Sequence, residues 1–321
     1  MVCPTIYFSV LVFGPVPSRR LGRSLGINNI PAKVCSYSCV YCQLGPTTST
    51  IVERRAFYDP ADVYKEAKRR LAQVRGRGEE VDYLTFVPDG EPTLDVNLGV
   101  EIKMLKKLGV PIAVLSNASL LYRKDVREDL AEADLVSLKV DAVSKEIWSR
   151  VNRPHGELDL NLLLEGCLDF AEEYGGKLIT ETMLIDGINY GEELDGIARY
   201  LSRLKPLKAY LAVPTRPPSE AWAKPAREEI LLRAFRLLTE ELGTDRVELL
   251  TGYEGNAFFP TGDPVNDLLS VTSVHPMRED AVRELLRRDN AGWEVVERLI
   301  REGKLVELKY EGHKFYIKRL R

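Results

Sequence analysis

The chain has 321 residues, of which 45% are apolar and 29% charged, and its net charge at neutral pH is −3. This composition is that of a globular protein with room for one large domain or two. The longest apolar run is far below the ~20 residues of a membrane-spanning helix, so we expect no membrane association. A net charge this small gives no overall attraction to nucleic acid, so we expect any polyanion site to be a local patch.

The amino-terminal segment contains a short apolar run over residues 6–13. No basic region precedes the run and no small-residue cleavage site follows it, so the segment lacks the pattern of a secretory signal. We therefore expect a cytoplasmic protein, in which cysteines stay reduced and form no disulfides. Arg19, Arg20 and Arg23 then precede the first predicted strand, residues 24–27.

Three of the five cysteines lie within eight residues, as Cys35, Cys39 and Cys42 in the spacing C-x3-C-x2-C. Thiolates this close on a loop can bind one soft metal centre. A structural zinc ion needs four ligands, and neither Cys3, Cys167 nor any of the three histidines has a paired spacing with this segment. We therefore predict a [4Fe–4S] cluster that keeps one iron open, with a zinc site as the alternative.

The same segment carries a family resemblance. The spacing C-x3-C-x2-C with an aromatic residue, Tyr41, before the last cysteine is similar to the radical S-adenosylmethionine superfamily. The wider stretch over residues 14–45 resembles a largely uncharacterised branch of it, related to the enzymes of molybdenum-cofactor and nitrogenase-cofactor biosynthesis. The resemblance covers roughly residues 14–260, the size of a barrel domain.

This resemblance implies an enzyme with two cofactors, a [4Fe–4S] cluster and S-adenosyl-L-methionine. Such an enzyme cleaves S-adenosylmethionine reductively, and the 5′-deoxyadenosyl radical so formed abstracts a hydrogen atom from the substrate. The electron comes from a donor such as ferredoxin or flavodoxin. The resemblance also implies that Val40 and Tyr41 pack against the adenine. The cofactors carry the difficult chemistry, so no Ser-His-Asp set is needed and no catalytic side chain is predicted.

Through the middle of the chain, short apolar runs alternate with amphipathic stretches. Helices between successive strands predict parallel pairing with right-handed crossovers. Six such units predict an α/β fold, a partial (β/α)6 TIM-like barrel over residues 1–264, with the reactive groups at the carboxyl ends of the strands. The predicted strands are 24–27, 83–87, 112–115, 135–140, 178–184 and 209–213, the helices between them are 60–74, 96–108, 126–133, 160–174 and 192–204, and a helix at 227–242 and a strand at 246–250 extend the domain.

The second predicted strand ends in Asp89-Gly90-Glu91-Pro92. Taken alone, such a segment is typical of an ordinary turn. After the cysteine segment it resembles the superfamily's glycine–glutamate motif, which implies that Gly90 and Glu91 hold the methionine amino group of S-adenosylmethionine. Asp89 departs from the glycine that many relatives have at this position.

Polar residues follow the next strands as well. Asn117, after the third strand, is placed either to bind the cofactor or substrate or to cap the turn. Ser137 and Lys139 share one face of the fourth strand, and a polar face on a central strand is costly unless it lines a cavity. The resemblance implies cofactor contacts at this position, so we predict that both bind the cofactor. The family's glycine-rich pattern is not evident on the fifth strand, where Asn189 is the nearest polar counterpart.

Four arginines are candidate substrate ligands: Arg19, Arg20, Arg153 and Arg216. A single arginine on a protein surface is usually solvated or paired. If these four gather at one rim of the barrel, they favour an anionic substrate, because guanidinium groups bind carboxylate and phosphate through paired hydrogen bonds.

Residues 265–321 change character and predict a small winged-helix-like α+β domain. Two helices at 277–288 and 292–302 are followed by strands at 304–309 and 313–319. The functional interpretation is nucleic-acid binding through the second helix, with basic residues on or near the wing. Glu294, Glu297 and Glu302 on that helix would repel phosphate, so a small interaction or capping domain is the alternative. The basic residues are Lys314, Lys318, Arg319 and Arg321.

Three functions remain open at this point. The first is radical modification of RNA, such as tRNA, recruited by the C-terminal domain. The second is radical modification of a protein or a small biosynthetic intermediate, with that domain as a lid or docking module. The third is an iron–sulfur regulator that binds DNA, but a regulator has no need of the Gly90-Glu91 segment.

Overall fold

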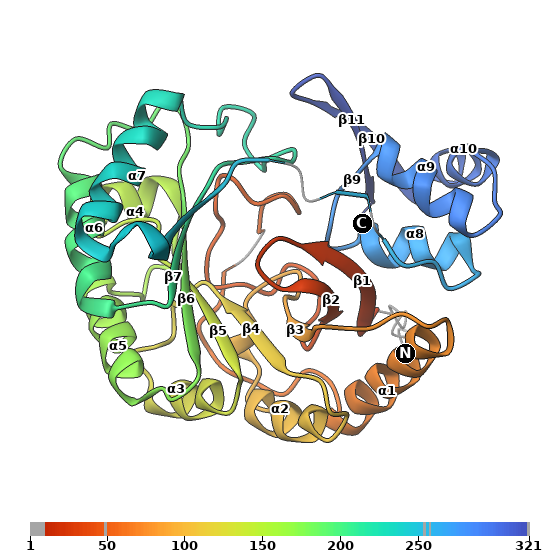
Figure 1. Cartoon of the computed structure of the whole chain (residues 1–321), viewed down its shortest axis with the longest axis horizontal. Coiled ribbons are helices and arrows are strands. Elements are labelled where there is room, and N and C mark those ends of the chain that lie inside the picture. Colours follow the sequence, from red (N-terminus) through yellow and green to blue (C-terminus); the bar gives the residue numbers. More distant parts are fainter. Residues whose placement is uncertain (1–9, 48–49, 253–254, 257, 320–321) are drawn as a thin grey trace, which may run out of the picture.

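A computed structural model describes residues 10–47, 50–252, 255–256 and 258–319, and its main feature is a curled eight-stranded sheet whose strands lie in chain order (Figure 1). The first two strands are antiparallel and every later neighbour is parallel. The strands are β1 Val12–Ser18, β2 Gly22–Ile27, β3 Tyr83–Phe86, β4 Ile112–Ser116, β5 Leu135–Lys139, β6 Lys177–Met183, β7 Lys208–Ala212 and β8 Val247–Leu250. The predicted partial barrel is therefore confirmed.

Helices cover the outer face of this sheet, as the sequence predicts (Figure 1). Their apolar sides pack on the strands in one continuous core that includes Val63, Ile102 and Phe170. The helices are α1 Pro60–Gly76, α2 Leu98–Lys106, α3 Lys124–Ala131, α4 Lys145–Val151, α5 Leu160–Glu173, α6 Glu193–Leu204 and α7 Glu228–Leu242. Helix α4 was not predicted, because it is only seven residues long and two turns give little periodic signal.

Strand β1 was not predicted either. It contains Pro15 and Pro17, which lack a donor for the ladder, and prolines occur in strands mainly at an edge. Here β1 is the edge strand, next to β2. The ring of Phe13 lies across Gly26, where an added Cβ atom would approach the ring to 2.1 Å. The turn after β1 contains Arg19 and Arg20.

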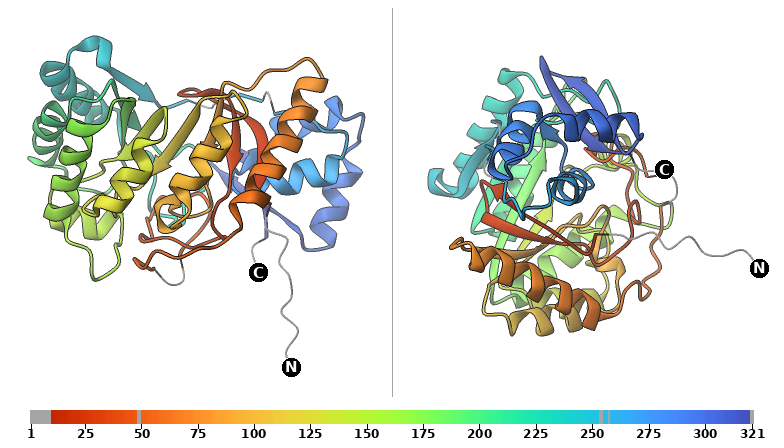
Figure 2. Two further views of the ribbon diagram at one scale, coloured as in Figure 1. Left: turned by 90° about the horizontal axis from the view of Figure 1, so that it is seen from below. Right: turned by 90° about the vertical axis from the view of Figure 1, so that its right-hand side faces the viewer.

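The C-terminal unit, residues 264–318, consists of three helices and a three-stranded sheet in the order β10-β11-β9 (Figure 2). Its elements are α8 Pro264–Thr272, β9 Met277–Arg278, α9 Glu279–Arg288, α10 Glu294–Arg301, β10 Leu305–Tyr310 and β11 His313–Lys318. The predicted helix–helix–hairpin layout is present. One detail was wrong: Met277 and Arg278 do not begin a helix but form a strand that pairs with Tyr316 and Phe315.

The C-terminal unit packs on the barrel through β1. Phe13 and Val16 of β1 belong to the same apolar cluster as Leu268, Met277 and Leu285 of the unit. The predicted domain boundary after residue 264 falls inside α8. Arg321 and Cys3 lie outside the described residues.

A buried ion pair crosses the same seam. Arg70 of α1 donates to Asp267 of α8 at 3.1 Å and to the carbonyl of Gly14 at 2.9 Å. The two side chains are 4% and 0% exposed. None of the described helices is long and apolar enough to cross a membrane.

Candidate functional site

The three cysteines lie on a loop that follows β2, at the carboxyl ends of the parallel strands. Backbone hydrogen bonds fix this loop from two sides. The amides of Ser38 and Val40 donate to carbonyls at the end of α4, those of Asn152 and Val151, at 3.1 and 2.9 Å. His155 donates from its amide to the carbonyl of Ser36 at 2.9 Å. The loop is therefore held in one shape before any metal binds.

The segment that ends β3 packs against the start of this loop. The amide of Glu91 donates to the carbonyl of Val34 at 3.0 Å, and the amide of Lys33 donates to the carbonyl of Asp89 at 2.7 Å. A Cβ atom at position 90 would lie 1.9 Å from the Val34 carbonyl oxygen. Only Gly90 allows this approach, which explains the glycine in the motif.

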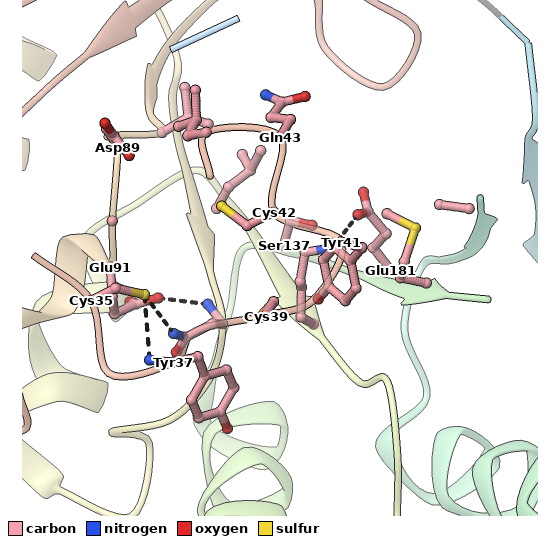
Figure 3. A pocket seen from close by; sticks show the side chains of 18 of the residues that line it. Cys35, Tyr37, Cys39, Tyr41, Cys42, Gln43, Asp89, Glu91, Ser137 and Glu181 are labelled. Atoms are coloured by element: carbon pink, nitrogen blue, oxygen red, sulfur yellow. Dashed lines mark hydrogen bonds and ion pairs between the residues drawn. The ribbon is translucent and has the colours of Figure 1, made fainter. Parts of the chain in front are cut away.

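A cavity of about 310 Å³ opens at this end of the barrel. Its volume is in the range of small-molecule sites. Figure 3 shows Cys35, Cys39 and Cys42 around this space, with Asp89 and Glu91 on one side and Glu181 on the other. Among the described residues that line it, the basic side chains are Arg19, Arg20, Lys33, Lys139 and Arg216 and the acidic ones are Asp89, Glu91 and Glu181. The lining thus carries more positive than negative charge.

The three cysteine side chains are free thiols and are half-buried. Burial raises the pKa of Cys39 to about 12 and the pKa of Cys35 well above its ordinary value. Burial also raises the pKa of Cys42, although the Lys33 ammonium opposes that shift. Thiols must lose their protons when they bind a metal. The positive charge of a metal centre would favour the thiolate form at these three cysteines.

Two amide groups and one backbone N–H are aimed at these sulfur atoms. Asn117 Nδ2 lies 3.6 Å from Cys35 Sγ, the Tyr37 amide 3.5 Å from the same sulfur, and Asn152 Nδ2 3.6 Å from Cys39 Sγ. Hydrogen bonds to cysteine sulfur tune the reduction potential of an iron–sulfur cluster. These donors therefore fit a redox-active cluster.

The donor set argues against the zinc alternative. Among the described residues, no three His, Cys, Asp or Glu side chains converge on a point where one ion could sit. A cluster of four irons spreads its thiolate ligands over different irons, so its cysteines need not converge. Three thiols that line one cavity without converging on a single ion position fit a [4Fe–4S] cluster.

A charged network lies across the cavity from the glutamate motif. Glu181 of β6 is paired with Lys139 of β5 at 2.5 Å and with Arg20 from the β1–β2 turn. Burial alone would raise the pKa of Glu181, but Arg20 and Lys139 outweigh it and hold the pKa at about 2. Burial alone would lower the pKa of Lys139, but Glu181 and Asp141 outweigh it and raise that pKa. Glu181 and Lys139 therefore both stay charged.

Most of the predicted site residues lie together. Tyr41, Gly90, Glu91, Asn117, Ser137 and Lys139 all line the cavity with the cysteines, and so do Arg19, Arg20 and Arg216. Asn117 also caps its turn, because its Oδ1 accepts from the amide of Ser119 at 2.9 Å.

Two predicted residues are not part of the cavity wall among the described residues. Val40 is fully buried and packs in the core behind the cysteine loop. Arg153 pairs with Glu220 at 2.5 Å outside the cavity. Arg153 therefore does not line the cavity with Arg19, Arg20 and Arg216, because the segment after α4 that carries it packs against the cysteine loop; its role as a substrate ligand stays a prediction.

The cavity residues that the sequence analysis missed include the polar side chains of Lys33, Gln43 and Glu181. A signal existed for Glu181, since a charged residue near the end of a buried strand is costly unless it faces a cavity. That argument identified Lys139 on β5 and applies equally to β6. Lys33 and Gln43 flank the cysteines and carry no signal of their own.

Comparison with known proteins gives consistent results. The sequence model described as "Radical SAM superfamily" matches residues 29–201. A protein of Methanocaldococcus jannaschii from the family UPF0026 is 47% identical over 312 residues, which cover 97% of each chain. That share includes the C-terminal unit.

Two solved structures have a similar fold. The structure of TYW1 with a lysine-pyruvate adduct bound has a TM-score of 0.52 and 20% identity, over 68% of this chain and 73% of that one. Streptococcus suis SuiB bound to S-adenosylmethionine has a TM-score of 0.51 and 16% identity, over 70% of this chain and 49% of that one. At these identities the likeness concerns the fold alone. The relation to the molybdenum-cofactor branch stays a prediction.

Proposed function

The chain belongs to the radical S-adenosylmethionine superfamily, and from that premise we propose that it is a radical enzyme for a substrate with an anionic group. Its cofactors are a [4Fe–4S] cluster and S-adenosylmethionine. One observation carries the proposal: a single cavity is lined by the three cysteines, by the Gly90–Glu91 turn and by three arginines.

The residues that line the cavity have different proposed roles, which follow from their positions. Cys35, Cys39 and Cys42 would hold the cluster. When bound, the two cofactors together supply a 5′-deoxyadenosyl radical, which removes a hydrogen atom that no acid or base in the site could remove. The turn that contains Gly90 and Glu91 would bind S-adenosylmethionine on one side together with Asn117, and Ser137 and Lys139 would bind it on the other, with Tyr41 against it. These groups bind, orient and exclude water.

The substrate would bind at the side of the cavity formed by Arg19, Arg20 and Arg216. Arg216 donates to Gln43 Oε1 at 3.1 Å and lies 3.0 Å from His275 Nε2 of the C-terminal unit. Burial and the Arg216 charge lower the pKa of His275 well below its ordinary value, so His275 stays neutral and can accept from Arg216. The arginine is therefore oriented before substrate arrives.

The test uses anaerobically purified and reconstituted protein. We expect about four irons per chain, the content of one [4Fe–4S] cluster, and release of methionine and 5′-deoxyadenosine from S-adenosylmethionine under dithionite. A small electron-transfer protein such as ferredoxin or flavodoxin should replace dithionite. S-adenosylhomocysteine as the sole product would instead indicate an ordinary methyltransferase and refute the proposal.

A specific observation favours RNA, such as tRNA, as the substrate. The β10–β11 hairpin contacts the rim of the cavity, where Tyr310 donates to the carbonyl of Pro214 at 3.1 Å. Lys309, His313 and Lys314 are exposed on this hairpin. A phosphate backbone bound there would pass the arginine side of the cavity. A protein or a small biosynthetic intermediate is the other candidate substrate.

A salt series decides between these substrates. Binding of total tRNA and of duplex DNA is measured between low and moderate salt, because contacts with phosphate weaken steeply as salt rises. Salt-dependent retention of tRNA, but not DNA, supports the RNA enzyme. Retention of DNA without cleavage of S-adenosylmethionine would support the regulator. If neither polyanion binds at low salt, the substrate is a protein or a metabolite.

A further inference from the structure

Three carboxylates line the cavity, and in two of them both oxygen atoms have partners. Glu181 is paired with Arg20 and Lys139. Glu91 Oε1 accepts from the amide and hydroxyl of Thr93, at 3.1 and 2.7 Å, and from the hydroxyl of Ser116 at 2.8 Å. Glu91 Oε2 accepts from the amide of Asn117 at 2.7 Å. Glu91 thus joins the ends of β3 and β4 and caps the short helix Pro92–Leu94.

The third carboxylate, Asp89, differs from these two. Its Oδ1 lies 3.4 Å from Lys33 Nζ, while its Oδ2 is buried and has no hydrogen-bond partner among the described residues. A buried carboxylate oxygen without a donor is costly. Asp89 is therefore the cavity carboxylate with an acceptor position still open.

Asp89 is also held firmly in place. Lys33 Nζ donates to the carbonyl of Gly45 at 2.9 Å, beyond the last cysteine, and the Lys33 amide donates to the carbonyl of Asp89. Lys33 thereby joins both ends of the cysteine loop to the turn before Gly90. A carboxylate fixed between these two segments lies at the wall of the cavity, one residue before the glycine–glutamate pair (Figure 3).

We propose that Asp89, rather than Glu91, supplies the carboxylate that accepts the ammonium group of S-adenosylmethionine in this protein. The inference rests on the proposed function and names the residue that binds one end of its cofactor. Gly90 keeps its role, because its missing side chain allows the close approach. Glu91 shapes the turn from behind.

The test compares two uncleaved ligands on cluster-loaded protein. S-adenosylhomocysteine carries the ammonium and carboxylate groups, and 5′-methylthioadenosine lacks both. Asp89→Asn keeps the size of the side chain and removes its charge. We expect it to weaken S-adenosylhomocysteine by about tenfold to a hundredfold, the effect of losing a charge-assisted hydrogen bond, and to leave the affinity for 5′-methylthioadenosine unchanged.

Three further variants make the result decisive. Asp89→Gly removes the whole side chain and should show the same loss. Asp82→Asn, a carboxylate 45% exposed outside the cavity, should behave as wild type. Glu91→Gln should lower the melting temperature and change both ligand affinities by one common factor. Iron content and melting temperature are recorded for every variant.

Two outcomes overturn the inference. One is unchanged affinity of both Asp89 variants for S-adenosylhomocysteine. The other is an equal loss for both ligands, which indicates a general distortion of the cavity. In either case wild-type protein that cleaves S-adenosylmethionine leaves the proposed function standing. Wild-type protein that binds no S-adenosylmethionine refutes the proposed function itself.

Discussion

The barrel mouth and the C-terminal unit place their charged groups in opposite ways. At the mouth, Glu181, Lys139 and Arg20 are largely buried and paired around a cavity. In the C-terminal unit, ion pairs such as Glu279–Arg283 lie on exposed helix faces around an apolar core. Burying a charge costs free energy that pairing only partly offsets, whereas exposed pairs contribute little. We therefore infer that the chemistry takes place at the barrel mouth and that the C-terminal unit acts through its position beside the cavity.

The largest effect should come from the cysteine loop. Cys35→Ala, Cys39→Ala and Cys42→Ala should each abolish or nearly abolish iron binding, because a cluster with three protein ligands cannot spare one. Iron content and the visible absorption of anaerobic protein measure this. Cys167→Ala, in the core behind the site, should retain full iron content. If Cys167→Ala also loses its iron, the prediction that only the loop cysteines hold the cluster is wrong.

The second largest effect should be a loss of stability when the ion pair between the barrel and the C-terminal unit is broken. Asp267→Asn leaves the Arg70 guanidinium buried without its counter-charge, and we expect a loss of about 3–5 kcal/mol in the free energy of unfolding. Urea denaturation followed at several wavelengths measures this. Asp245→Asn, on an exposed turn, is the control. A separate early transition would indicate that the C-terminal unit detaches first. No change would mean that the apolar contacts of β1 alone hold the unit.

Glu101 of α2 is a buried carboxyl group that lies away from the barrel mouth, so it shows how burial acts on a carboxyl group outside the cavity. Burial, with a smaller contribution from Asp95, raises the pKa of Glu101 to about 9. The unfolded chain therefore loses this proton near pH 4.5 and the folded chain keeps it to about pH 9. Stability should fall as pH rises through that window, by about 3 kcal/mol at pH 7.

Glu101→Gln should remove this dependence. The variant should match wild type near pH 5 and exceed it in stability at pH 8, when urea midpoints are compared. Glu172→Gln, an exposed residue on α5, should change neither curve. If Glu101→Gln is less stable than wild type at pH 8, then Glu101 is ionised in the folded protein and has a counter-charge.

The smallest effect concerns the C-terminal hairpin. Lys309→Glu should weaken tRNA binding only a few-fold and lower its salt dependence by about the contribution of one phosphate contact. Cleavage of S-adenosylmethionine without substrate should not change. Lys107→Glu, at the end of α2 that leads into β4 and so at the opposite end of the barrel, should have no effect. Equal effects of the two variants would indicate non-specific binding.

The sequence alone determined the family, the cofactors and the alternation of strands and helices from β2 to β8, except for the short helix α4. The three cysteines lie within eight residues, so their spacing is set by local chain geometry. The strands follow from short apolar runs and the helices from amphipathic ones, and parallel pairing follows from their alternation. Because Ser137 and Lys139 share one face of β5, the sequence also predicted that both line a cavity.

Only the tertiary structure decided which distant residues meet. Arg20 and Glu181 are 161 positions apart and pair because the β1–β2 turn reaches over the end of β6. Long-range packing also places Arg153 outside the cavity. The same kind of packing places the C-terminal unit on β1. The open oxygen of Asp89 and the protonated state of Glu101 depend on burial and on nearby partners, which no local sequence pattern records.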